Sequence, residues 1–213
     1  RHKDFKAFVD ATGYDATKKK DGKVMAIHWA DCSWEITPDH PVSLLNGQDG
    51  EAFCKWLTKI EKEKGVIKGN QKYRLPTDHE WSCAAGIGED ENAEETPKEK
   101  IGKIKKFSWG YDFPPPMNHE NTGGVADGYK HTAPVGSFKP NKNGLYDMGG
   151  NNSEVCTYTD KNEKLFDVTR GPNCWPDLNP KFKEYYYLSH RLVWDGESPR
   201  GLEHGFRCVL VSE

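Results

Sequence analysis

The sequence predicts an irregular α+β fold with two main helices, short antiparallel strands and long loops. Hydrophobic residues make up 35% of the 213 residues and aromatic residues 12%, while 21 glycines and 13 prolines are spread along the chain. An aromatic core beneath glycine- and proline-rich loops is typical of such folds rather than of helix bundles. A chain of this length buries one substantial core, so we expect a single domain over residues 1–213. Because the sequence opens in mid-pattern, it also fits the C-terminal part of a longer protein.

Three segments have the apolar spacing of helices. Apolar residues recur at helical spacing over residues 5–12, and again as a stripe over residues 49–63. Thr77 is followed three residues later by Glu80, which is the signature of a capping box at the start of a helix. The sequence therefore predicts a further helix over residues 78–85.

Strands are predicted where β-branched and aromatic residues lie between turn signals. Residues 24–34 are rich in such side chains and predict a strand, and two more short strands are predicted near residues 168–170 and 205–211. Residues 89–106 are acidic and then basic with little to bury, so we expect a solvated surface excursion there.

The charge balance gives no general attraction to polyanions. Lysine and arginine number 30 against 33 acidic residues, which leaves a formal net charge of −3. No apolar run approaches the roughly 20 residues of a membrane span. We therefore expect no nucleic-acid partner and no membrane span. The six cysteines form no Cys-x-x-Cys pair, which argues against a zinc ribbon.

Standard hydrolase, metalloprotease and nucleotide-binding signatures are missing from the sequence. Two loop segments instead carry the carboxylate, amide and carbonyl oxygens that calcium prefers, although loops of this composition are more often simple turns. The candidate ligands are Asp147 and Glu154 with the carbonyls of Gly150 and Asn152, and, upstream, Asn118 with Asp127 and Tyr129.

Five segments together resemble the sulfatase-modifying-factor family, which contains the formylglycine-generating enzymes and non-enzymatic relatives. These segments are Arg74–Trp81, Thr132–Phe138, Gly144–Glu154, Arg170–Gly171 and Gly205–Cys208. The resemblance covers nearly the whole chain. It implies the fold of that family, which is a glycine-rich elaboration of the C-type lectin fold.

The resemblance also implies metal sites and a cysteine pairing. In the formylglycine-generating enzymes, two structural calcium ions lie in loops that match the two candidate sets, with the carbonyl of His119 added to the upstream one. Cys54 and Cys208 match positions that form a disulfide in some family members. The alternative is a pair of packed, reduced thiols.

The catalytic centre of the family is not matched. The formylglycine-generating enzymes oxidise a substrate cysteine with two cysteines that lie a few residues apart and bind copper(I), a metal that prefers thiolates. Cys174 lies near the first of these positions, but residues 177–183, where the second belongs, hold no cysteine. We therefore expect no copper and no enzymatic activity. An oxidative enzyme with an altered site is the alternative.

Residues 173–204 are rich in large amphipathic side chains of the kind that dominate binding hot spots. In an alternating strand, Tyr185 and Tyr187 would share one face and Tyr186 the other. The predicted ligand-binding residues are Trp175, Asp177, Tyr185, Tyr186, Tyr187, His190, Trp194, Arg200 and His204.

This pattern is similar to the variable proteins of diversity-generating retroelements, in which a C-terminal segment on this fold is diversified. The leading hypothesis is a non-catalytic domain that presents residues 173–204 to a protein or surface-glycan ligand on a calcium-stabilised scaffold. A sensor domain attached to a bacterial kinase and a purely structural module are the other hypotheses. We expect a bacterial or viral protein, whose compartment and oligomeric state the sequence leaves open.

Overall fold

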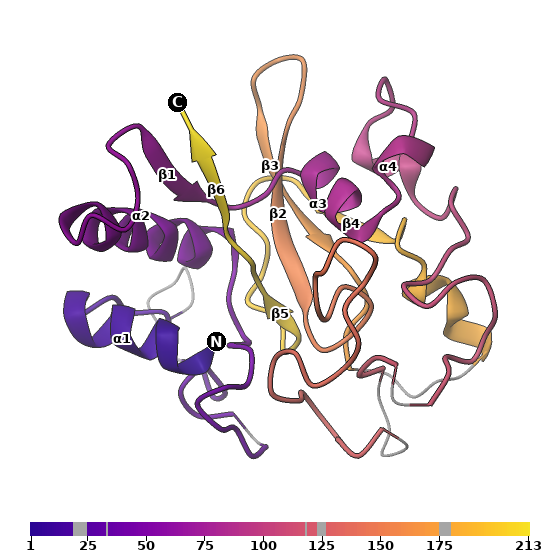
Figure 1. The fold of residues 1–213 in the computed structure, drawn as a ribbon, viewed down its shortest axis with the longest axis horizontal. Helices are drawn as coiled ribbons and strands as arrows, with labels where there is room; N and C mark the ends of the chain where they lie inside the picture. The colour runs from indigo at the N-terminus through magenta and orange to yellow at the C-terminus, as the bar shows by residue number, and fades with distance from the viewer. Residues whose placement is uncertain (19–24, 33, 118, 123–126, 175–179) are drawn as a thin grey trace.

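Helices flank two small β-sheets in the computed structural model (Figure 1). The described residues are 1–18, 25–32, 34–117, 119–122, 127–174 and 180–213. Helices α1 (His2–Thr12) and α2 (Gly47–Glu63) lie side by side at one end of the molecule, and α3 (Asp78–Ala85) lies beyond the sheets. The predicted α+β class is confirmed.

Helix α2 begins two residues before the predicted position because Asn46 caps it. The Asn46 side-chain oxygen accepts from the backbone N–H of Asp49, and the Asp49 carboxylate accepts from the N–H of Asn46, both at 3.0 Å. Phe53 on α2 contacts Phe5 and Phe8 on α1, with ring centroids 6.1 and 5.8 Å apart. These aromatic contacts hold the two helices together.

The larger sheet has four strands in the order β4, β3, β2, β5. Their bounds are β2 Ser153–Thr159, β3 Leu165–Arg170, β4 Arg191–Trp194 and β5 His204–Gly205. The pairs β2–β3 and β3–β4 are antiparallel, whereas β5 runs parallel to β2 and sets Ser153 opposite His204. Parallel pairing requires a long connection. It therefore brings residues from distant parts of the sequence to one edge of the sheet.

The smaller sheet joins β1 (Gln71–Arg74) to β6 (Val209–Ser212) in antiparallel fashion. The remaining short helices are η1 (Gly88–Asp90), α4 (Pro97–Lys100) and η2 (Pro180–Tyr186). Among the described residues, no helix has both the length and the apolar character needed to cross a bilayer.

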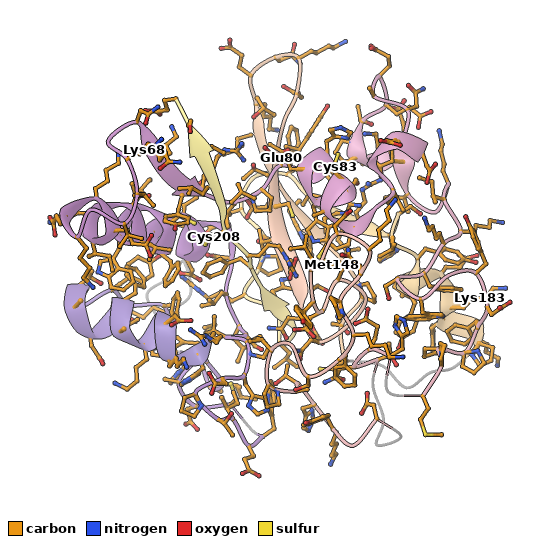
Figure 2. The ribbon with its side chains drawn as sticks, viewed as in Figure 1. Lys68, Glu80, Cys83, Met148, Lys183 and Cys208 are labelled. Atoms are coloured by element: carbon orange, nitrogen blue, oxygen red, sulfur yellow. The ribbon has the colours of Figure 1, made fainter. Side chains whose placement is uncertain are left out.

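A second core cluster fills the space between α3 and the larger sheet. Trp81 and Cys156 are buried there together with Met148, which Figure 2 labels near the middle of the molecule. Helix α3 has the predicted bounds. Its capping box is also present, because the Thr77 hydroxyl accepts from the Glu80 N–H at 3.2 Å and the Glu80 carboxylate accepts from the Thr77 N–H at 2.8 Å.

A network of buried charges ties α3 to the strands of the larger sheet. Arg170 donates to Asp78 Oδ1 at 2.6 Å, and Arg191 Nε lies 3.0 Å from the same oxygen. Arg191 also pairs with Glu91, whose other oxygen lies 3.3 Å from Lys100 Nζ. All five side chains are almost completely buried. Burying charges is tolerable only when they are paired in this way.

Three predicted segments were wrong in part. Residues 89–106 are not a wholly solvated excursion, because Glu91 and Lys100 join the buried charge network. In the described part of residues 24–34, the Asp31 N–H donates to the His28 carbonyl at 3.0 Å, which closes a turn with an isolated bridge in place of a strand. The strand predicted near residues 205–211 is divided into β5 and β6.

The three consecutive tyrosines do not alternate as a strand would. They follow the helical course of η2, so Tyr186 and Tyr187 are buried while Tyr185 is 50% exposed. The 3₁₀ geometry of η2 sets Tyr185 and Tyr186 about 120° apart around the axis, and Tyr187 follows the end of the helix. The alternation that a strand would give is therefore absent.

Candidate functional site

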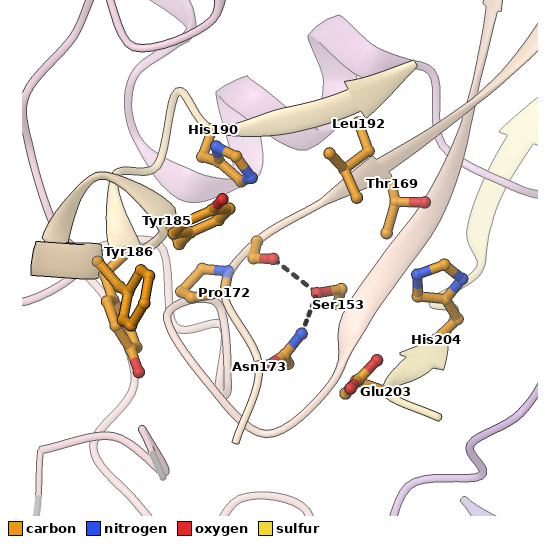
Figure 3. A pocket seen from close by; sticks show the side chains of 12 residues that line it. Ser153, Thr169, Pro172, Asn173, Tyr185, Tyr186, His190, Leu192, Glu203 and His204 are labelled. Carbon is orange, nitrogen blue, oxygen red and sulfur yellow. Dashed lines mark hydrogen bonds between the residues drawn. The ribbon is translucent and has the colours of Figure 1, made fainter. Parts of the chain in front are cut away.

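A cleft of about 360 Å³ opens beside the larger sheet, between β3 and η2 (Figure 3). We call it the β3–η2 cleft. It is lined by Ser153, Thr169, Gly171, Pro172, Asn173, Phe182, Tyr185, Tyr186, His190, Leu192, Glu203 and His204. Its walls come from parts of the chain that only the sheet topology brings together.

Hydrogen bonds shape the floor of the cleft. The Ser153 hydroxyl donates to the Gly171 carbonyl at 2.9 Å and accepts from the Asn173 amide at 3.1 Å, contacts that Figure 3 draws as dashed lines. Gly171 has a φ of 77°, and a Cβ there would lie 3.0 Å from the Trp81 ring. Glycine is thus required at this turn by both its conformation and its close contact.

One wall of the cleft is aromatic and partly exposed. Phe182 and Tyr185 are 42% and 50% exposed, with ring centroids 6.1 Å apart. The Tyr185 ring meets the His190 ring edge to face at 4.9 Å. Leu192 on β4 is 43% exposed at the sheet side of the same cleft. Exposed apolar side chains gathered around a concavity are typical of binding sites.

The opposite end of the cleft carries hydrogen-bond acceptors. His204 Nδ1 lies 3.0 Å from the Pro199 carbonyl oxygen, which can only accept, so Nδ1 carries the proton. Burial lowers the pKa of His204 and likewise that of His190. Near neutral pH, His204 is therefore uncharged and its Nε2 atom is an acceptor. The carboxylate of Glu203 lies beside it in the cleft (Figure 3).

Trp194 contacts two residues of the cleft, Thr169 and His204. Its indole N–H donates to the Thr169 hydroxyl at 2.9 Å, and its ring lies 6.3 Å from that of His204. Trp194 itself does not line the cleft. It holds two residues that do.

The predicted binding residues therefore separate into groups. Tyr185, Tyr186, His190 and His204 come together around the cleft, although the Tyr186 hydroxyl is already bonded to the Thr122 carbonyl at 2.9 Å. Trp175 and Asp177 lie outside the described residues.

Tyr187 and Arg200 lie away from the cleft. The Tyr187 ring packs on Phe107 at 5.1 Å. Arg200 donates to both Asp49 oxygens at 2.6 and 2.7 Å, so it anchors its segment to α2.

Several cleft residues were not predicted at all. Ser153 and Thr169 reach the cleft through strand pairing with segments far away in the sequence, and no local pattern marks such pairing. Phe182, Leu192 and Glu203 lie within the predicted segment but lacked a signal that distinguished them from their neighbours. Exposed apolar residues beside predicted glycine turns would have been the nearest clue.

Cys174 comes directly after the cleft residue Asn173 in the sequence but is not an activated thiol. It is buried, and its backbone N–H donates to the Asn151 carbonyl at 2.9 Å. Burial raises the pKa of Cys174 to about 12. A thiol with such a pKa is protonated at neutral pH and is a poor nucleophile.

Only part of the upstream calcium set can be examined, since Asn118 lies outside the described residues. The Asp127 carboxylate accepts from the backbone N–H groups of Tyr129 at 2.9 Å and of Thr122 at 3.3 Å. The bond from Tyr129 is that of an Asx turn, and the bond from Thr122 ties the turn to the preceding segment.

In the second calcium set, the Asp147 carboxylate has one oxygen free to bind a cation, whereas both oxygens of Glu154 already accept hydrogen bonds. Asp147 Oδ2 accepts from the Gly136 N–H at 2.9 Å, while Oδ1 is buried and has no hydrogen-bond partner within the described part of the chain. Both Glu154 oxygens accept from Arg207 at 2.5 and 2.6 Å, and one also accepts from the Trp81 indole at 2.7 Å. Asp147 therefore favours a cation, whereas Glu154 would have to share one with a guanidinium.

Backbone geometry in this set is tight. A Cβ at Gly150 would lie 2.2 Å from the Asn121 carbonyl oxygen, so only glycine fits there. The side-chain amide of Asn152 donates to the Val42 carbonyl at 3.1 Å. The predicted calcium ligand at this position is the backbone carbonyl of Asn152.

The sequence did not point to Glu120, a buried carboxylate in the same region. Its Oε2 atom has no hydrogen-bond partner among the described residues. Burial raises the pKa of Glu120 to about 8, and the nearby Asp147 charge acts in the same direction. Within the described residues, no three His, Cys, Asp or Glu side chains form a group that could hold a metal ion. Backbone carbonyls would have to complete any calcium shell.

A second cavity of about 890 Å³ lies on another part of the surface. It runs between the helices α1 and α2 and the loop that contains Tyr146, and it includes Asp147 and Arg207. Phe53 and Trp56 give it an apolar wall. It is the principal competitor of the β3–η2 cleft for a binding role.

Residues 2–211 match the family described as Sulfatase-modifying factor enzyme 1-like domain. The formylglycine-generating enzyme of Bos taurus is 34% identical over 127 residues, which cover 54% of this chain and 26% of that protein. That of Mus musculus is 28% identical over 196 residues, covering 80% of this chain and 44% of the enzyme. The chain thus spans less than half the length of these curated relatives.

Solved structures have the same fold. PvdO from Pseudomonas aeruginosa superposes with a TM-score of 0.67 at 21% identity, covering 100% of this chain and 77% of that one. Treponema denticola variable protein 1 superposes with a TM-score of 0.58 at 18% identity, covering 97% and 80%. At such identities the likeness concerns the fold alone.

These relatives correct the expectation that the chain is not an enzyme. Sequence similarity of 28–34% links it to four proteins named formylglycine-generating enzyme. The missing second cysteine is therefore not sufficient ground for excluding catalysis.

Proposed function

This chain belongs to the sulfatase-modifying factor enzyme 1-like family, and from that premise we propose that it is a ligand-binding domain. Its binding site is the β3–η2 cleft. Its ligand is a polypeptide that inserts a side chain into the cleft and lies across the exposed residues around it.

The observation that carries this proposal is the composition of the cleft. Exposed rings of Phe182 and Tyr185 and the exposed Leu192 surround a floor of hydrogen-bonding groups. Amphipathic aromatic residues around a small concavity are the usual anchors of protein recognition. A volume of about 360 Å³ suits one or two side chains better than a large cofactor.

A random-peptide library panned against the domain tests this proposal. We expect selected peptides to lose binding to Leu192→Ser, because the substitution removes apolar area from the cleft. The matched control is Leu165→Ser, which changes a leucine of similar exposure, 48% against 43%, on the neighbouring strand but outside the cleft. Equal loss in both variants, or failure of the library to yield any binding peptide, would contradict the proposal.

Calcium in the loop that contains Asp147, which borders the second cavity, is the second part of this proposal. Its support is the pair of buried, unpartnered oxygens Asp147 Oδ1 and Glu120 Oε2, since a buried carboxylate oxygen without a donor is costly unless a cation compensates it. The residues that would hold the ion are Asp147, with the carbonyls of Gly150 and Asn152. Glu154 would contribute only by sharing its carboxylate with Arg207.

Thermal unfolding in calcium and in EDTA tests the metal. A ligand at 100 times its Kd stabilises the folded state by about 2.7 kcal/mol, so we expect a clear rise of the melting temperature with calcium. Asp147→Asn should reduce this rise, whereas Asp90→Asn, at an exposed aspartate on η1, should not. Equal melting temperatures in calcium and EDTA, with no calcium found by metal analysis, would contradict the calcium proposal.

An oxidative reaction in the same cleft is the second candidate function. Its support is the similarity to proteins named formylglycine-generating enzyme and the position of Cys174 directly after the cleft residue Asn173. The residues present do not fit a two-thiolate copper(I) site, because Cys174 would be its single cysteine: residues 177–183 contain no other. Oxygen consumption with a cysteine-containing peptide, abolished by Cys174→Ser, would establish this reaction.

Diversification of residues 173–204 stays a prediction. A neighbouring reverse-transcriptase gene with a near-copy of this coding region would support it. A kinase domain in the same gene would instead favour the sensor hypothesis.

A further inference from the structure

We propose that the β3–η2 cleft selects a cationic side chain, lysine or arginine, from its polypeptide ligand; this rests on the proposed function. Among the twelve described residues that line the cleft there is no lysine or arginine, and Glu203 is the one carboxylate. The cleft is therefore acidic in a region where the histidines are neutral.

Glu203 is a carboxylate without a counter-ion. No salt bridge or hydrogen bond joins its side chain to another described residue, although it is only partly exposed. Its charge is felt locally, because it helps to raise the pKa of Cys174. A carboxylate that faces a cavity without a cationic neighbour favours a positive ligand group.

His204 adds a second acceptor beside Glu203. Its proton lies on Nδ1, which faces the Pro199 carbonyl, so Nε2 can only accept while the ring is neutral. An ammonium or guanidinium group offers several N–H donors at once. A carboxylate ligand offers none, and it would also be repelled by Glu203.

The aromatic wall suits the stem of the same ligand group. Figure 3 shows Tyr185 and Tyr186 on one side of the cleft and His204 with Glu203 on the other. A lysine or arginine stem lying over the tyrosine rings would carry its charged end to the acceptors. Aromatic faces attract cations, and the aliphatic stems of these residues pack well on apolar surface.

The two guanidinium groups close to His190 do not oppose this arrangement. Arg170 and Arg191, the guanidinium groups close to His190, are completely buried and are paired with Asp78 and Glu91. Burial lowers the pKa of His190, so it carries no charge near neutral pH. The exposed charge of the cleft is thus that of Glu203.

Titration with capped single amino acids, followed by amide NMR shifts of cleft residues, tests the inference. The probes are the Nα-acetyl methylamides of arginine, lysine, citrulline, norleucine and glutamate. Citrulline keeps the shape of arginine without its charge, and norleucine keeps the stem of lysine. We expect arginine and lysine to bind about tenfold more tightly than their neutral counterparts, and glutamate not to bind.

Two variants locate the charge effect. Glu203→Gln should reduce arginine binding about tenfold to the level of citrulline, since the charge-assisted hydrogen bonds are lost. Glu89→Gln removes an equal charge from the exposed η1 and should leave the affinity unchanged. Circular dichroism spectra identical to wild type confirm that both variants are folded.

The outcomes separate this inference from the proposed function. If norleucine or citrulline binds in the cleft as well as arginine, or Glu203→Gln has no effect, the cation preference is wrong while binding in the cleft stands. Failure of arginine to shift any cleft residue at its solubility limit also overturns the preference. If peptides selected from a library are insensitive to Leu192→Ser as well, the proposed function fails with it.

Discussion

Arg170 is a charged side chain with no exposed surface, and its surroundings explain why it is stable there. Its guanidinium donates to Asp78, to the Ser82 hydroxyl at 2.9 Å and to the Leu188 carbonyl at 3.0 Å, and it lies 4.4 Å from the Trp81 ring centre. Removing one partner of a buried ion pair leaves the other charge uncompensated. This residue therefore fixes α3 against β3.

Arg170→Met should destabilise the domain by about 3–5 kcal/mol in urea unfolding, the range found when a buried ion pair loses one partner. The control is Arg74→Met. Arg74 also bonds a carboxylate, that of Glu80 at 2.6 Å, but both side chains are more than a third exposed. Arg74→Met should lower the free energy of unfolding by about 1 kcal/mol or less. Similar costs for the two variants would show that burial of the network contributes nothing.

His204 makes stability depend on pH. Burial lowers its pKa in the folded protein below the unfolded value of about 6.5. Between these two values the unfolded chain binds more protons, so stability is full above about pH 6.5 and falls as the pH drops below it. His2, His40 and His190 have lowered pKa values for the same reason and act in the same direction.

We therefore expect the urea midpoint to fall between pH 7.5 and pH 5.5. His204→Asn, which keeps a donor for the Pro199 carbonyl but does not titrate, should weaken this fall. A variant with the full wild-type dependence would mean that His204 is equally easy to protonate in both states.

At the scale of elements, local signals were read correctly and non-local ones were missed. Helix α3 has its predicted bounds because the capping box of Thr77 and Glu80 is contained within four residues. The two-residue strand β5 left no signal, because it exists only through its parallel pairing with β2. The sequence around Tyr185 has a strand-like composition, but Pro180 begins a helical segment instead.

The end of the chain is held to α2 by a pair of cysteines. Cys54 on α2 is buried, and its Sγ lies 3.3 Å from Sγ of Cys208, just before β6. Contact with the second thiol and burial strongly raise the pKa of Cys54, so its thiol is protonated at neutral pH. The two thiols are adjacent but not bonded, so the disulfide implied by the family resemblance stays a prediction beside the alternative of packed, reduced thiols.

Mild oxidation should raise the melting temperature, because a disulfide here would close a loop of more than 150 residues. Loops of this length correspond to about 3–5 kcal/mol of stabilisation. Cys54→Ser should abolish the response, whereas Cys83→Ser, which removes an exposed thiol on α3, should keep it. Loss of the response in both variants would point to a different cysteine pair.

At the scale of the whole molecule, the cleft is assembled from one end of the larger sheet and the segment that connects β3 to β4. The composition of residues 173–204 indicated a binding surface, and four of its predicted residues lie around the cleft. Arg200 and Tyr187 were predicted beside them because composition cannot distinguish an anchor or a core ring from a ligand contact. Only the fold separates these roles.

The most direct measurement is hydrogen exchange of the domain with and without a library-selected peptide. Binding in the β3–η2 cleft predicts protection confined to residues 169–173 and 182–204, with α1 and α2 unchanged. Protection of α1, α2 and the loop around Tyr146, which border the larger cavity, with none in the cleft would contradict the account.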